Sequence, residues 1–146
     1  LRTMSKGYSL AGLRFGYGIG PSQLISPMMY KTRDSYNTDF IAQKLATAAI
    51  LDTTYAQNTW QKVRASRQQL AKDLAHLGIS SLPSQANFLL CEIPKIPGAQ
   101  ALYQSLKMQN ILVRYFDQDR LKNKLRISIG NGPENQRLIS AISQLL

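Results

Sequence analysis

The first fourteen residues hold the side chains whose types and spacing could do chemistry. Lys6 follows the hydroxyl residues Thr3 and Ser5, small residues come next, and Arg14 stands eight positions further on. Hydroxyls and a guanidinium bind phosphate, and the guanidinium keeps its charge at any working pH. An uncharged lysine amine is a nucleophile toward an aldehyde. Most loop lysines are only solvated surface, but this combination predicts a site for a phosphate-bearing aldehyde.

Hydrophobic periodicity predicts the elements that hold these residues. Alternation over residues 13–19 favours a strand. Residues 38–39 can cap a helix that is apolar around much of its circumference, so we expect that helix to be well buried. A long helix is expected over residues 53–76, and its two arginines, Arg64 and Arg67, are expected on its solvent face.

From residue 79 the pattern changes to short apolar strands that alternate with helices. We expect strands at 79–82, 86–93, 111–116 and 125–130, and helices at 98–109 and 133–146. Pro133 near the start of the last helix, with Glu134 in its first turn, is typical of a helix N-terminus. Helices laid across strands predict the α/β class. The long helix is expected to join residues 1–60 to a smaller domain of residues 61–146.

The segment from Thr3 to Gly12 resembles the lysine signature of the class II aminotransferases, which belong to the fold-type-I pyridoxal-phosphate enzymes. Arg14 falls on the phosphate-binding arginine of that family. The resemblance implies that Lys6 carries pyridoxal 5'-phosphate as a Schiff base and moves a proton during catalysis. It also implies that Thr3, Ser5 and Arg14 hold the cofactor phosphate.

Two later segments are similar to the histidinol-phosphate aminotransferase branch of that family. They are the run that ends at Arg114-Tyr-Phe and the run around Arg126. The similarity implies that Arg126 pairs with a substrate α-carboxylate and that Arg114 helps to hold a substrate phosphate. Other class II aminotransferases and a threonine-phosphate decarboxylase remain alternatives. The loop at Tyr36 also resembles this branch, and the Asn87-Phe88 pair resembles a small-domain strand of the family.

The same resemblance implies a domain organisation and an assembly. Residues 1–60 would be the C-terminal part of the cofactor-binding large domain, and residues 61–146 the small C-terminal domain. The family's other cofactor contacts have no match here, so we expect a part of a longer protein that is inactive alone and exposes apolar surface in residues 1–60. The full-length enzyme would be a cytoplasmic homodimer that acts on a small amino-acid or phosphorylated substrate.

Composition tests a different class of function. The net charge is +10, from 18 basic and 8 acidic residues, which favours anionic partners. A basic module that binds anions or nucleic acid is therefore the alternative. However, the charge is spread along the chain without a basic run or interleaved aromatic residues, so we do not expect nucleic acid as a partner.

The remaining residues of interest have ordinary explanations. Cys91 lies in an apolar run, where a buried and inert thiol is expected. His76 has no metal-ligating neighbours at a suitable spacing, and no metal site is predicted. Trp60 belongs to the apolar stripe of the long helix and is expected in a core. No apolar run is long enough to cross a membrane.

Overall fold

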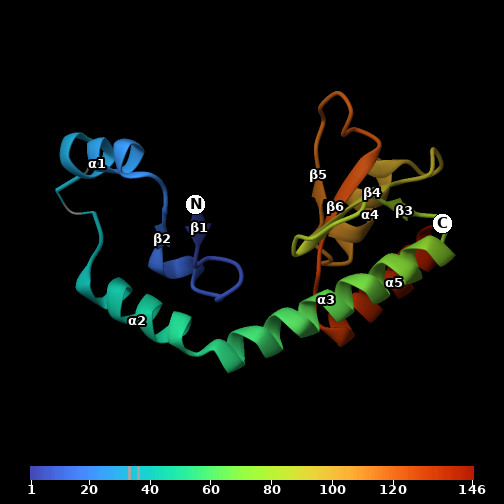
Figure 1. Ribbon diagram of the computed structural model, residues 1–146. Coiled ribbons are helices and arrows are strands. Elements are labelled where there is room, and N and C mark those ends of the chain that lie inside the picture. The colour runs from blue at the N-terminus through green and yellow to red at the C-terminus, as the bar shows by residue number, and fades with distance from the viewer. Residues whose placement is uncertain (33, 36) are drawn as a thin grey trace. The chain divides into compact units, whose positions relative to one another are not determined.

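A computed structural model describes residues 1–32, 34–35 and 37–146, and Tyr36 lies outside the described residues. The chain divides into two compact units, Leu1–Trp60 and Gln61–Leu146, and each is described by itself. The first contains β1 (Arg2–Thr3), the 3-10 helix η1 (Ala11–Leu13), β2 (Gly16–Tyr17), α1 (Ser22–Lys31), α2 (Phe40–Leu51) and the start of α3 (Thr53–His76) (Figure 1). The second contains the rest of α3, β3 (Ser80–Ser81), β4 (Phe88–Glu92), α4 (Ala99–Met108), β5 (Arg114–Tyr115), β6 (Lys124–Ser128) and α5 (Gly132–Leu145).

Side-chain caps begin α2 and α3 in the first unit, and the cap of α2 lies where the sequence predicts it. The Asp39 carboxylate accepts a hydrogen bond from the backbone N–H of Ala42 at 2.7 Å, at the start of α2. The Asp52 carboxylate accepts from the N–H of Tyr55 at 3.0 Å, at the start of α3. Each carboxylate satisfies a backbone donor that has no partner within its helix.

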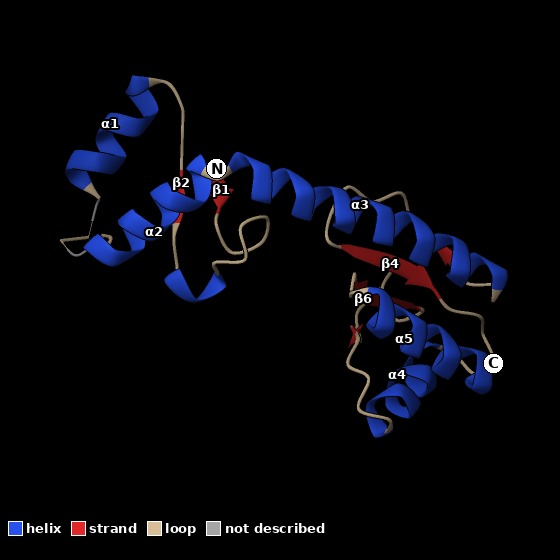
Figure 2. Ribbon diagram, turned by 90° about the horizontal axis from the view of Figure 1, so that it is seen from below, coloured by secondary structure: helices blue, strands red, loops and turns tan. Residues whose placement is uncertain are grey.

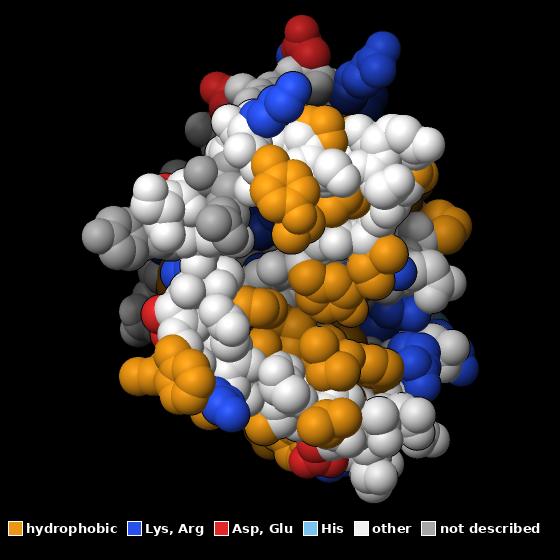
Figure 3. All heavy atoms as spheres, turned by 60° about the vertical axis from the view of Figure 1, so that its left-hand side comes forward, with side chains coloured by type: hydrophobic (Ala, Val, Ile, Leu, Met, Phe, Trp, Pro, Cys, Tyr) orange, Lys and Arg blue, Asp and Glu red, His pale blue; other side chains and the backbone are white. Residues whose placement is uncertain are grey.

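The prediction that α2 is well buried is wrong. Phe40 is 71% exposed and Ile41 67% exposed, while the buried residues of α2 are the alanines Ala42 and Ala46. The exposed apolar surface expected for residues 1–60 is present, and Figure 3 shows hydrophobic side chains gathered on one face of the molecule. The apolar side chains of α2 therefore have too few packing partners within this unit to be buried.

The strand predicted over residues 13–19 is shorter than expected. Only Gly16–Tyr17 is paired, antiparallel to β1, with Arg2 opposite Tyr17. Leu13 belongs to η1 instead, and Arg14 adopts the left-handed conformation, with a φ of 52°. A left-handed residue cannot continue a pleated strand, so the alternating pattern is interrupted at residue 14.

The second unit is built on an antiparallel sheet of four strands in the order β3-β4-β6-β5. Mixed helix and sheet confirms the α/β class. Successive side chains of a strand point to opposite faces, so Leu89 and Cys91 of β4 share a face with Leu125 and Ile127 of β6. All four are buried in one cluster with residues of α3, α4 and α5. Figure 2 shows these three helices beside the sheet.

The start of α5 confirms the turn predicted around Pro133. The Asn131 side chain accepts from the N–H of Glu134 at 2.9 Å, and the Glu134 carboxylate accepts from the N–H of Asn131 at 2.8 Å. This reciprocal pair is a capping box, with Pro133 in the first turn. It fixes the point at which the chain leaves β6 and starts α5.

Cys91 is buried, as expected, and burial raises the pKa of its thiol to about 12. Such a thiol stays protonated and unreactive near neutral pH. Among the described residues, no group of three or more metal-ligating side chains lies together, and His76 is exposed. No helix in the described ranges is both long and apolar enough to span a membrane.

Candidate active site

The backbone around Lys6 forms a closed loop that presents this side chain to solvent. The loop begins at Met4, which is fully buried and whose N–H donates to the Phe15 carbonyl at 3.1 Å. It closes where the N–H of Leu10 donates to the Met4 carbonyl at 3.0 Å, and the N–H of Ser9 donates to the Lys6 carbonyl at 3.0 Å. We call residues 4–10 the lysine loop. The buried methionine anchors a loop whose central lysine is exposed.

The two hydroxyls predicted beside Lys6 lie together. Thr3 Oγ1 donates to Ser5 Oγ at 3.0 Å and accepts from the Ser5 N–H at 3.1 Å. Hydroxyl hydrogens rotate, so both groups can turn to donate to an anion that approaches them. The backbone N–H of Ser5 already points into the same small cluster.

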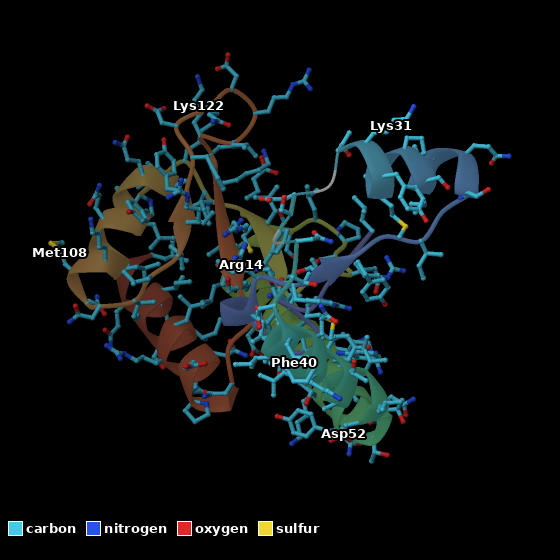
Figure 4. All side chains as sticks on the ribbon, turned by 90° about the vertical axis from the view of Figure 1, so that its left-hand side faces the viewer. Arg14, Lys31, Phe40, Asp52, Met108 and Lys122 are labelled. Atoms are coloured by element: carbon cyan, nitrogen blue, oxygen red, sulfur yellow. The ribbon has the colours of Figure 1, made fainter. Side chains whose placement is uncertain are left out.

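Arg14 follows η1 and is exposed (Figure 4). Its backbone is left-handed, an uncommon conformation for a residue with a side chain, and its Nη1 donates to the Ala11 carbonyl at 3.0 Å. A guanidinium has five N–H donors, so this one bond leaves others for a phosphate. Left-handed residues of this kind concentrate at ligand sites, which agrees with the predicted role of Arg14.

Trp60 supports the lysine loop, a role that the helical stripe did not reveal. Its Nε1 donates to the Gly7 carbonyl at 2.7 Å, and its ring makes an edge contact with Tyr8, at 5.6 Å between centroids. A side chain on Gly7 would place its Cβ 3.0 Å from Trp60 Nε1, closer than normal packing allows. Trp60 is half-buried against this loop instead of lying in a closed core.

The second unit brings the other two predicted residues together. Arg114 of β5 lies directly opposite Arg126 of β6, on the sheet face that points away from the helices. Both are exposed, and neither forms an ion pair with a carboxylate in the described part of the chain. Lys122 pairs with Asp119 on the β5–β6 loop. Like charges opposite each other on a sheet are unfavourable unless an anion binds between them.

Arg67 corrects the prediction that both arginines of the long helix face solvent. It is 8% exposed, and its Nη1 donates to the Ala86 carbonyl at 2.9 Å. Its Nη2 lies 3.4 Å from Gln85 Oε1. Arg67 therefore fixes the turn that leads into β4, whereas Arg64 is exposed as predicted.

The donor set suits a phosphate-bearing aldehyde. The lysine loop and its flanks offer one amine, two hydroxyls and one guanidinium within twelve residues, Thr3 to Arg14. The exposed Lys6 amine can reach an aldehyde carbon, and Thr3, Ser5 and Arg14 can donate to phosphate oxygens. Pyridoxal 5'-phosphate carries both of these groups, so the residues present fit it.

Comparison with known proteins agrees with this chemistry. The family described as "Aminotransferase class I and II" matches residues 1–142. Histidinol-phosphate aminotransferase 1 of Nostoc sp. is 52% identical over 146 residues, which are 100% of this chain and 41% of that protein. The histidinol-phosphate aminotransferase of Microcystis aeruginosa is 51% identical over 99% of this chain and 41% of its own length.

Solved structures show the same fold. The histidinol-phosphate aminotransferase from Sinorhizobium meliloti, in complex with pyridoxal-5'-phosphate, superposes with a TM-score of 0.88 at 29% identity, over 99% of this chain and 40% of that one. The enzyme from Clostridium acetobutylicum gives a TM-score of 0.89 at 25% identity, over 98% of this chain and 44% of that one. The chain thus spans about 41% of the length of these curated relatives, and it belongs to the class I and II aminotransferase family.

Proposed function

We propose that this chain is the C-terminal part of a pyridoxal-phosphate-dependent aminotransferase that exchanges an amino group between histidinol phosphate and 2-oxoglutarate. The products are imidazole acetol phosphate and glutamate. The lysine loop and its flanks carry the proposal, because together they hold an accessible amine and a phosphate-binding donor set. Relatives named histidinol-phosphate aminotransferase, with identities up to 52% across the whole chain, support the choice of substrate.

The first unit would hold the cofactor. Arg14, Thr3 and Ser5 would hold its phosphate, and the Lys6 amine would hold its aldehyde group. When bound, pyridoxal phosphate supplies an electron-withdrawing ring that stabilises negative charge at the substrate Cα. Lys6 removes the proton from that Cα once the amine is free, as a positioned general base. Trp60 keeps the Gly7 carbonyl in place, which limits the directions in which the neighbouring Lys6 can point.

The second unit would hold the substrates. Arg126 pairs with the α-carboxylate of glutamate or 2-oxoglutarate, and Arg114 pairs with the phosphate of histidinol phosphate. A guanidinium binds either anion with two parallel N–H donors, which fixes orientation as well as adding affinity. Because histidinol phosphate has no carboxylate, the two arginines serve different halves of the reaction.

The domain assignment follows from the same proposal. Residues 1–60 form the end of the cofactor-binding large domain, and residues 61–146 form the small domain. The proposed ligands are small amino-acid and phosphorylated molecules, and neither nucleic acid nor membrane has a proposed role. The full-length enzyme is proposed to be a cytoplasmic homodimer.

Reduction of the cofactor onto the protein tests the role of Lys6. The full-length protein is incubated with pyridoxal phosphate, treated with borohydride, digested and analysed by mass spectrometry. We expect the cofactor adduct on Lys6, and we expect Lys6→Ala to lose both the adduct and the absorbance band near the visible edge. Lys44→Ala, on the exposed side of α2, is the matched control and should retain both. An adduct on another lysine would refute the assignment.

The same preparation identifies the reaction. We expect glutamate as substrate together with imidazole acetol phosphate to yield 2-oxoglutarate. Release of carbon dioxide from threonine phosphate, without amino transfer, would instead favour the threonine-phosphate decarboxylase alternative. Binding of anions with neither activity would favour the basic module.

A further inference from the structure

Two aromatic rings, Phe88 and Phe116, lie against Arg114 and Arg126 in the second unit, and they differ in which arginines they contact. The Arg114 guanidinium carbon lies 5.2 Å from the centroid of the Phe116 ring. The Arg126 guanidinium carbon lies 5.9 Å from the same ring and 5.3 Å from the ring of Phe88. Phe116 therefore contacts both arginines, whereas Phe88 contacts Arg126 alone.

The sheet register explains this arrangement. Arg114 is opposite Arg126, so the two arginines point to the same face, and Phe116 directly follows β5. Phe88 is opposite Ser128, one step along the same face from Arg126. Both rings are half-buried, so their positions are fixed by packing while the guanidinium groups remain exposed.

An aromatic ring holds a guanidinium in a way that a carboxylate does not. The ring attracts the cation through its negative face but carries no formal charge, so the positive charge stays available to an anion. Contact with a fixed ring also reduces the rotamer freedom that an exposed arginine would lose when it binds a ligand. Two guanidinium groups that pair with no carboxylate among the described residues can thus be held ready for anions.

We propose that Phe116 is a positioning residue that sets Arg114 and Arg126 together, whereas Phe88 positions Arg126 alone. The proposal rests on the proposed function, in which Arg114 binds phosphate and Arg126 binds a carboxylate. It follows that one ring supports recognition of both substrates, and the other supports recognition of the dicarboxylic substrate only. Neither phenylalanine touches the reacting atoms in this account.

Equilibrium binding of two unreactive anions tests the proposal on the full-length, cofactor-loaded protein. The probes are succinate for the carboxylate site and glycerol 3-phosphate for the phosphate site, each titrated by calorimetry. Phe116→Leu keeps an apolar side chain but removes the ring, and we expect it to weaken both probes about fivefold. Phe88→Leu should weaken succinate by a similar factor and leave glycerol 3-phosphate within about twofold.

A conservative variant separates positioning from simple packing. Phe116→Tyr retains the ring and should bind both probes within about twofold of the original protein. Phe116→Met is the second variant if the leucine protein does not fold, and the same pattern is expected from it. A packing defect would change unfolding midpoints without distinguishing one anion from the other, whereas the proposal requires a difference between Phe116 and Phe88.

Two outcomes overturn the proposal in distinguishable ways. If Phe116→Leu weakens one probe only, or Phe88→Leu weakens both equally, the assignment of the rings is wrong and the proposed function stands. If Arg126→Ala does not weaken succinate and Arg114→Ala does not weaken glycerol 3-phosphate, the substrate roles themselves fail, and the positioning role fails with them.

Discussion

The two units hold their functional side chains by different means. In the second unit, a continuous cluster of fourteen buried residues packs beneath the sheet, and Arg114 and Arg126 project from the opposite face. In the described part of the first unit, the buried apolar residues are Met4 and three alanines, and the lysine loop is held by backbone hydrogen bonds and by Trp60. The arginines stand on a packed scaffold, whereas Lys6 stands on a locally closed loop.

This difference shows what each unit needs from its surroundings. A cluster that joins strands to helices can stabilise the second unit without further partners. The first unit instead exposes large apolar side chains on α1 and α2, and contiguous apolar surface of this kind normally lies against another surface. If the proposed function is correct, the surface that covers these side chains belongs to the rest of the aminotransferase.

Removing a leucine from each unit should give the largest contrast. Leu102 is 0% exposed in the second unit and Leu51 is 74% exposed in the first. In the 146-residue chain, we expect Leu102→Ala to lower the free energy of unfolding by about 3 kcal/mol, because it leaves a cavity in the core. Leu51→Ala should change it by less than about 0.5 kcal/mol. Urea unfolding followed by circular dichroism measures both, and equal losses would contradict the comparison.

The two arginines of α3 give the next contrast. Arg67→Ala removes the donor to the half-buried Ala86 carbonyl, so we expect a loss of about 2 kcal/mol in the free energy of unfolding. Arg64→Ala, on an exposed position of the same helix, should cost less than about 0.5 kcal/mol. Hydrogen exchange should also quicken at residues 84–87 in the Arg67 variant alone. Unchanged exchange there would show that Arg67 does not hold the turn.

The sequence predicts local features well. The cap at Asp39 and the helix start at Pro133 bear out this point, because a helix N-terminus depends on a few consecutive residues. The Lys6 segment is likewise contiguous, and the types and spacing of its residues predict a site for a phosphate-bearing aldehyde. The assignments of individual site residues to cofactor and substrate stay predictions until the variants are measured.

Features that depend on distant parts of the chain were not predictable. Arg64 and Arg67 are three positions apart on one helix, and only the return of the chain at residues 84–87 makes one of them buried. Trp60 lies 53 positions from Gly7, and no periodicity links the two. The wrong prediction for α2 has the same cause. Its apolar residues suggest burial, but the described part of this unit does not bury them.

The hydrogen bond between Trp60 and Gly7 gives the smallest contrast and the most direct test of how Lys6 is held. Trp60→Phe keeps an aromatic ring but loses the Nε1 donor, so the Gly7 carbonyl loses its partner. We expect a cost of about 1 kcal/mol, since a single neutral hydrogen bond contributes about that much. In the full-length protein, this should appear as faster hydrogen exchange at residues 5–9 with little change across residues 88–92.

Tyr55→Phe is the matched control for that test. Tyr55 is on the same helix, is exposed, and loses only a solvated hydroxyl when it is replaced. Its exchange pattern should equal that of the original protein at both segments. If Trp60→Phe also leaves residues 5–9 unchanged, the backbone hydrogen bonds at Met4 and Lys6 suffice to hold the loop. In that case the lysine loop would need no side-chain support, like the sheet face that carries Arg114 and Arg126. The contrast between the two units would then be limited to their cores.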